Sequence, residues 1–235
     1  MSCVVIVGGT SGLGLELARH YADRNGADRG LDVVVTGRDP ARAEAAAAGL
    51  PGEATALAFD LAEPHLIGPA LKPVGEVRHL VLAAIERDHN TIADFDVDRA
   101  LRLATLKLVG YLEVIHSLRT RMADDGSVLL FGGQAKERPY PGSTTVSTVN
   151  GGVVGMLMSL VSELKPLRVN ALHPGIVGDS PYWAGNDAAL TATRARTPTG
   201  RLVTMADVIG AATFLLENPA VNGVNLPVDG GWGLP

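Results

Sequence analysis

Three glycines at the start of the chain, Gly8, Gly12 and Gly14, have the types and spacing of a phosphate-binding loop. An apolar run at residues 3–7 precedes them, and leucines at helical spacing follow them. Glycines between a buried strand and a helix let the backbone approach a pyrophosphate, whose charge the helix N–H groups receive. The alternative is a glycine turn that binds nothing. The pattern favours a dinucleotide site formed by Gly8, Thr10, Ser11, Gly12, Leu13 and Gly14.

An arginine follows the second apolar run and bears on which dinucleotide is bound. An acidic residue at the tip of this strand would accept a hydrogen bond from the ribose of NAD, but the tip here is Thr36 and Gly37, followed by Arg38. A planar guanidinium suits a 2′-phosphate. The alternative is that Arg38 is a solvated loop charge. Asp39 before Pro40 is better explained as the N-cap of the next helix. We therefore expect NADP, with NAD less favoured.

The spacing of the glycines resembles that of the short-chain dehydrogenase/reductase family, and four later landmarks occur in the family's order. They are Asp60 with Leu61, residues 126–131, residues 168–175 and residues 228–231. Together they extend the resemblance over nearly the whole chain. The resemblance implies that Asp60 lies against the adenine, and that Gly37 followed by Arg38 accompanies NADP. It also adds Leu61, Ala83, Ala84, Pro174, Gly175 and Val177 to the cofactor site.

The positions at which the family keeps its catalytic side chains hold other residues. In the frame set by residues 126–131 and the helix after them, Gly133 replaces the family's serine and Val146 its tyrosine. Asn150 replaces its lysine, and Lys107 replaces its asparagine. Val146 cannot pass a proton, and Asn150 can hydrogen-bond a ribose but carries no charge. The sequence is therefore identified as a divergent member that lacks the usual Ser-Tyr-Lys set.

Two side chains are candidates for the missing proton donor. Lys107 lies between leucines on a long predicted helix, and a lysine in an apolar cleft has a lowered pKa that suits acid–base work. The alternative is a lysine that reaches water or pairs with Glu113. Tyr140 lies on the loop after the fifth predicted strand; the alternative is an aromatic side chain that packs beside two prolines.

Other polar residues near the predicted site have simpler explanations. Tyr111, one turn from Lys107, is expected in the core or at an interface. Glu86, Asp88 and His89 follow the fourth predicted strand, and we expect an exposed polar loop there. No set of His, Cys, Asp and Glu shows the spacing of metal ligands, so no metal is expected.

The elements that position these residues alternate between strand and helix. Strands are expected near 3–7, 32–36, 55–59, 79–83, 127–131, 167–171 and 223–227, and helices near 12–23, 40–48, 65–72, 98–121, 148–164 and 205–217. This alternation predicts a single-domain, doubly wound Rossmann-type α/β fold over residues 1–235, with a parallel sheet of about seven strands and helices on both faces. Residues 179–197 correspond to the family's substrate lid and carry large aromatic side chains.

The amino-acid composition indicates which classes of partner and which cellular compartment are expected. The 235 residues carry a formal net charge of −5 without clusters of lysine or arginine, so no nucleic-acid partner is expected. The single cysteine, Cys3, fits a reducing cytoplasm, and no apolar run approaches the length of a membrane span. Small residues at Gly151, Gly152 and Gly155 favour close helix contact, and the resemblance implies a homodimer or homotetramer.

Two hypotheses about function remain open at this point. The first is an NADP-dependent oxidoreductase that acts on a small organic substrate with a non-standard proton donor. The second is a non-catalytic nucleotide-binding protein that serves as a scaffold or partner.

Overall fold

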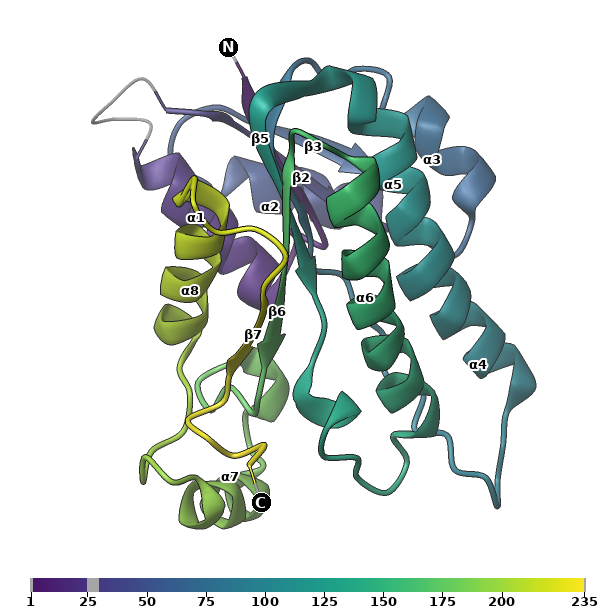
Figure 1. Ribbon diagram of the computed structural model, residues 1–235, viewed down its shortest axis with the longest axis vertical. Helices are drawn as coiled ribbons and strands as arrows, with labels where there is room; N and C mark the ends of the chain where they lie inside the picture. Colours follow the sequence, from purple (N-terminus) through teal and green to yellow (C-terminus); the bar gives the residue numbers. More distant parts are fainter. Residues whose placement is uncertain (1, 25–29, 235) are drawn as a thin grey trace.

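The computed structural model describes residues 2–24 and 30–234, which form one seven-stranded parallel sheet between two layers of helices (Figure 1). The strands are β1 (Cys3–Val7), β2 (Asp32–Gly37), β3 (Ala54–Ala58), β4 (Val77–Leu82), β5 (Met122–Phe131), β6 (Arg168–Pro174) and β7 (Asn225–Val228). Their order is β3-β2-β1-β4-β5-β6-β7. The predicted doubly wound fold is confirmed.

One helical layer packs on one side of the sheet and the second on the other. The first contains α1 (Gly12–Arg24), α2 (Pro40–Ala48) and α8 (Met205–Glu217), and its core includes Leu17 and Val208. The second contains α3 (Pro64–Ala70), α4 (Val97–Ala104), α5 (Tyr111–Leu118) and α6 (Thr144–Glu163), with Leu130 and Leu157 in its core. Because both faces of the sheet are covered, the central strand β1 is apolar along its whole length and buried at every residue.

The chain moves outward from β1 to β3 and then returns to β4 on the other side of β1. The carboxyl ends of β1 and β4 therefore diverge into helices on opposite faces and leave a crevice between them. Ligands of open α/β sheets bind at such a switch point. The glycine loop follows β1, so the topology places it in this crevice.

Asp39 caps α2 as predicted, because its carboxylate accepts a hydrogen bond of 2.8 Å from the backbone N–H of Arg42 and Pro40 occupies the first turn. Two features of the helices were not predicted. The long helix expected at 98–121 is interrupted by a π-helical segment, Thr105–Gly110, and the 179–197 segment contains a helix, α7 (Asp187–Arg196). π-helical turns are rare and occur often at functional sites.

Helix α6 corrects the expectation that no segment approaches a membrane span. By length and composition alone this described helix could cross a membrane, with a mean hydropathy of 1.3 over its most apolar window. Val153 and Leu157 of α6 are fully buried in the core. A core helix of a folded domain meets the same criterion, so this is weak evidence for a membrane.

Candidate functional site

A large cavity of about 1020 Å³ lies at the carboxyl ends of the central strands. It brings together all of the predicted cofactor residues, which lie far apart in the sequence: Gly8, Thr10, Ser11, Gly12, Leu13, Gly14, Arg38, Asp60, Leu61, Ala83, Ala84, Pro174, Gly175 and Val177. The candidate catalytic residues and the residues expected at the family's catalytic positions line the same cavity: Lys107, Gly133, Tyr140, Val146 and Asn150.

The glycine loop is tightly packed on one side and open on the other. A Cβ at Gly14 would lie 2.2 Å from the carbonyl oxygen of Gly8, and a Cβ at Gly8 would lie 2.6 Å from the backbone nitrogen of Ala84. Gly12, by contrast, has a φ of 52° and open space where its Cβ would lie. Backbone without side chains therefore faces the cavity at the start of α1, which is the arrangement that a pyrophosphate needs.

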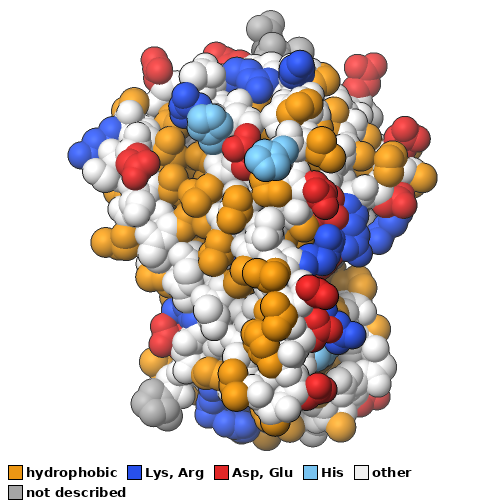
Figure 2. Space-filling model, turned by 90° about the vertical axis from the view of Figure 1, so that its right-hand side faces the viewer, with side chains coloured by type: hydrophobic (Ala, Val, Ile, Leu, Met, Phe, Trp, Pro, Cys, Tyr) orange, Lys and Arg blue, Asp and Glu red, His pale blue; other side chains and the backbone are white. Residues whose placement is uncertain are grey.

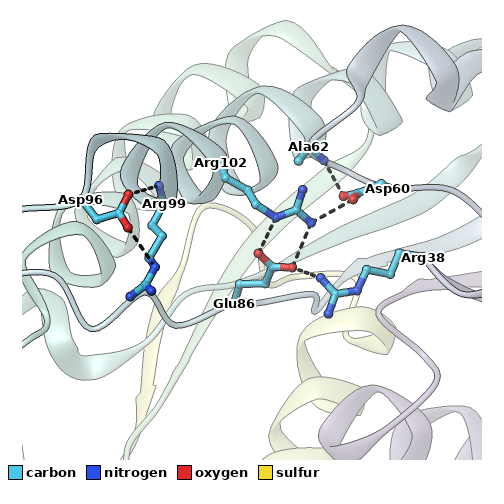
Figure 3. Close-up of polar contacts among 7 residues, drawn as sticks. All are labelled: Arg38, Asp60, Ala62, Glu86, Asp96, Arg99 and Arg102. Atoms are coloured by element: carbon cyan, nitrogen blue, oxygen red, sulfur yellow. Dashed lines mark hydrogen bonds and ion pairs between the residues drawn. The ribbon is translucent and has the colours of Figure 1, made fainter.

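Arg38 and Asp60 meet in one network of charges at the end of the cavity next to β2 and β3 (Figure 3). Glu86 forms ion pairs with Arg38 and with Arg102, and Arg102 also bonds Asp60 at 2.8 Å. Burial acts to raise the pKa of Asp60, but hydrogen bonds from the Ala62 N–H and from Arg102 outweigh it and lower that pKa. The network contains two guanidiniums and two carboxylates, so its formal charges cancel.

This network corrects the expectation that Glu86 and Asp88 belong to an exposed loop. Glu86 is half-buried between the two arginines, and Asp88 is buried where it accepts a hydrogen bond of 2.6 Å from the Asn90 side chain. Of the three residues considered together, only His89 is exposed. Arg102 was not predicted at all, since its partners lie 16 and 42 residues away and no local pattern connects them.

Lys107 is fully buried, which excludes the alternative that it reaches water. Its ammonium donates hydrogen bonds to the Tyr111 hydroxyl at 2.9 Å and to the Ala84 carbonyl at 3.3 Å. Burial lowers the pKa of Lys107 to about 7, and the positive charge of Arg87 contributes to the decrease. Glu113 is not its partner, because that carboxylate accepts a hydrogen bond of 2.9 Å from Ser117.

Tyr111 belongs to the core, where it is fully buried. Its hydroxyl donates a hydrogen bond of 2.7 Å to the Ala84 carbonyl while it accepts one from Lys107. Burial raises the pKa of Tyr111 well above its ordinary value, so the phenol stays protonated. Tyr140, in contrast, is 42% exposed at the edge of the cavity.

The residues expected at the family's catalytic positions, Gly133, Val146 and Asn150, lie next to one another. A Cβ at Gly133 would lie 2.9 Å from the Asn150 side-chain nitrogen, and Val146 is one helical turn before Asn150 on α6. The Asn150 side chain is buried and lines the cavity, yet its Oδ1 atom has no hydrogen-bond partner. A buried polar atom without a partner is costly, and a bound ribose hydroxyl would satisfy it. Asn150 and the glycine loop therefore fit a dinucleotide at both ends of the cavity.

Comparison with known proteins decides the family. A family model described as enoyl-(acyl carrier protein) reductase matches residues 8–233. The chain belongs to the short-chain dehydrogenase/reductase family. The 3-oxoacyl-[acyl-carrier-protein] reductase of Bos taurus is 32% identical over 234 residues, which cover 96% of this chain and 95% of that protein.

Solved structures of the family have the same fold. The MalC reductase/Diels-Alderase of Malbranchea aurantiaca superimposes with a TM-score of 0.88 at 24% identity, over 100% of this chain and 97% of that one. A small-chain dehydrogenase solved in complex with NADPH superimposes with a TM-score of 0.82 at 23% identity, over 100% of this chain and 99% of the other. Family membership makes this chain an oxidoreductase-like protein with a nicotinamide-cofactor fold.

Proposed function

We propose that this protein is an NADPH-dependent reductase in which Lys107 supplies the proton that other members of the family take from a tyrosine. The observation that carries the proposal is the buried Lys107 ammonium in the wall of the cavity, with a pKa of about 7. An acid whose pKa lies near the working pH is the most effective proton donor. The reductase relatives and the NADPH-bound structural neighbour support the class of reaction.

The contacts of Lys107 leave one proton available. Two of its three N–H groups are donated to Tyr111 and Ala84, and no described residue accepts the third. A neutral amine still has two N–H groups, so Lys107 keeps both hydrogen bonds after it has given up a proton. Loss of the proton therefore breaks no contact within the protein, and it removes a buried charge.

The reaction that fits this site is reduction of a carbonyl or an iminium carbon. Bound NADPH would supply the hydride. Lys107 would transfer its proton to the oxygen of a carbonyl acceptor, and solvent that enters the cavity after product release would return a proton to the amine. An iminium acceptor needs no proton in this step, because hydride addition gives the neutral amine directly. Gly133 and Val146 offer no side-chain donor, so we propose that acceptors already activated for hydride are preferred.

The test is NADPH consumption against a panel of ketones and imines by the unmodified protein and by Lys107→Met. Lys72→Met, at an exposed position, is the matched control. We expect loss of ketone reduction in Lys107→Met alone, with imine reduction less affected. Rapid ketone reduction that is unchanged in Lys107→Met would show that another group donates the proton. NADPH binding without turnover of any acceptor would favour the non-catalytic alternative.

A further inference from the structure

Besides Arg42 on α2, two arginines of the cavity wall do not belong to the charge network at the β2 end, Arg87 and Arg138. Arg87 follows β4, and its guanidinium carbon lies 3.6 Å from the ring centroid of Tyr182. Arg138 follows β5, lies 4.9 Å from the ring centroid of Trp232 and donates a hydrogen bond to the Trp232 carbonyl. Both therefore lie against aromatic rings at the end of the cavity formed by the 179–197 segment and the C-terminal residues.

No carboxylate of the described chain neutralises either arginine. The cavity is lined by three acidic residues, Asp39, Asp60 and Glu86. Asp39 caps α2, while Asp60 and Glu86 are engaged by Arg102 and Arg38. The ion pairs found among residues 2–24 and 30–234 include neither Arg87 nor Arg138. A nearby carboxylate, Asp88, is buried and bonded to Asn90, so no described ion pair neutralises the two arginines at this end of the cavity.

Arg87 is held in place by its neighbours in the chain. Asp88 and Asn90 are buried, and the Asn90 amide bonds Asp88 at 2.6 Å and the Asp96 carbonyl at 3.0 Å. The backbone N–H of Asp96 returns a hydrogen bond of 2.8 Å to Asn90. The loop is therefore fixed to the start of α4. Tyr182 lies against the guanidinium and the Tyr140 hydroxyl forms a hydrogen bond with it, so the arginine is oriented by two aromatic side chains. A guanidinium has five N–H donors, and those that Tyr140 does not engage can bind a ligand.

Arg87 also lies on the side of the cavity where we place the chemistry. Its charge is close enough to contribute to the lowered pKa of Lys107. A ligand group held by Arg87 would thus bring the rest of a small molecule toward Lys107, Val146 and Asn150. A guanidinium edge matches a carboxylate, with two parallel N–H···O bonds.

We infer that the acceptor is an organic acid, an oxo acid or imino acid whose carboxylate binds Arg87, while Arg138 adds positive charge at the same end of the cavity. This inference rests on the proposed reductase function and names its substrate class. Binding of the carboxylate is separate from the chemistry, so it predicts an effect on KM at Arg87 and an effect on kcat at Lys107.

The first experiment compares matched acids and esters in steady-state kinetics with NADPH: phenylpyruvate, acetoacetate and pyrroline carboxylate, each against its methyl ester. We expect kcat/KM to be roughly tenfold to a hundredfold higher for an acid, the range of a charge-assisted contact. Arg87→Gln should remove this preference by raising KM for the acid much more than for the ester, and Arg138→Gln should do so in part. Arg78→Gln is the control, because Arg78 pairs with Asp125 and does not line the cavity.

A second experiment measures ligand binding, so it tests the carboxylate site even if the protein reduces none of these compounds. Calorimetric binding of phenyllactate and of its methyl ester is measured in the presence of NADP. Binding of the acid alone, lost in Arg87→Gln, would support the carboxylate site even if the reductase proposal failed. Equal binding of acid and ester, or no binding of either, would overturn it, as would an equal loss of acid and ester turnover in Arg87→Gln.

Discussion

The ammonium of Lys107 donates a hydrogen bond of 2.9 Å to the hydroxyl of Tyr111, and both side chains are fully buried. The two residues lie four positions apart, and the π-helical segment Thr105–Gly110 contains Lys107 and ends immediately before Tyr111. Both side chains also bond the carbonyl of Ala84, directly after β4. The pair therefore connects the long helix to the strand end at which a cofactor would lie.

The pKa of Lys107 predicts how stability depends on pH. The folded pKa is about 7 against an ordinary value of 10.5, so between these values the unfolded chain binds more protons than the folded one. The free energy of unfolding should thus rise with pH across this window, and the contribution should be constant below about pH 7. Denaturant unfolding at several pH values should show that Lys107→Met lacks this rise. Parallel profiles for both proteins would contradict the prediction.

Removal of the Tyr111 hydroxyl should affect both stability and the pH profile. Tyr111→Phe deletes one acceptor of the Lys107 ammonium and costs about 1–2 kcal/mol of unfolding free energy. Because the charged amine loses more than the neutral one, the pKa of Lys107 should fall further. If Lys107 is the acid, the decrease of kcat with rising pH should then begin at a lower pH. A pH profile that does not move would argue against Lys107 as the donor.

Arg38 should set the preference between cofactors. We expect NADPH to bind more tightly than NADH, and Arg38→Asp to remove a contact worth roughly 1.5–3 kcal/mol, or tens-fold in affinity. Glu86→Gln should strengthen NADPH binding several-fold, because Glu86 competes with a 2′-phosphate for Arg38. Fluorescence titration measures the affinities for NADPH and NADH. The control is Arg99→Gln, which removes a neighbouring ion pair outside the cavity. Equal affinities in the unmodified protein would contradict the prediction.

Placing a tyrosine and a lysine where the family resemblance expects them should raise the rate of ketone reduction. We expect little turnover of simple ketones by the unmodified protein, since Val146 at the expected tyrosine position cannot supply acid catalysis, which is worth about 10²–10⁴-fold. The double variant Val146→Tyr/Asn150→Lys should reduce such ketones faster, because both positions line the cavity on α6. Thermal unfolding of the variant checks that the buried substitutions are tolerated. Comparable rates in a folded double variant would count against the assignment of these positions.

We propose that the protein forms a homodimer or homotetramer through α4, α5 and α6. Exposed apolar side chains lie on these helices and on the π-helical segment between α4 and α5: Val97, Leu101, Val109, Leu112 and Met158. A Cβ at Gly151 or Gly155 would contact nothing. Figure 2 shows hydrophobic side chains gathered on the face at the right of Figure 1, where α4 and α5 lie. Light scattering should detect an oligomer that Leu101→Glu weakens and Phe214→Glu, on α8, leaves intact. A monomer at micromolar concentration would refute the proposal.

The sequence by itself determined the sheet and the glycine loop. Each rests on local information: apolar strands such as Cys3–Val7 are buried on both faces, and Gly8, Gly12 and Gly14 are close enough in sequence to act in one turn. The N-cap at Asp39 could be predicted for the same reason, since its partner is three residues away.

Only the tertiary structure decided which charges meet and which are buried. Glu86 lies 48 residues from Arg38 and 16 from Arg102, so their ion pairs depend on the packing of β2, β4 and α4. Lys107 lies in a π-helical segment that no residue type in the sequence signals, and its side chain is fully buried there. The contact of Arg87 with Tyr182 could not be predicted from the sequence, because the two residues lie 95 positions apart. Long-range electrostatics and packing are properties of the assembled fold, whereas strand and turn patterns belong to short stretches of chain.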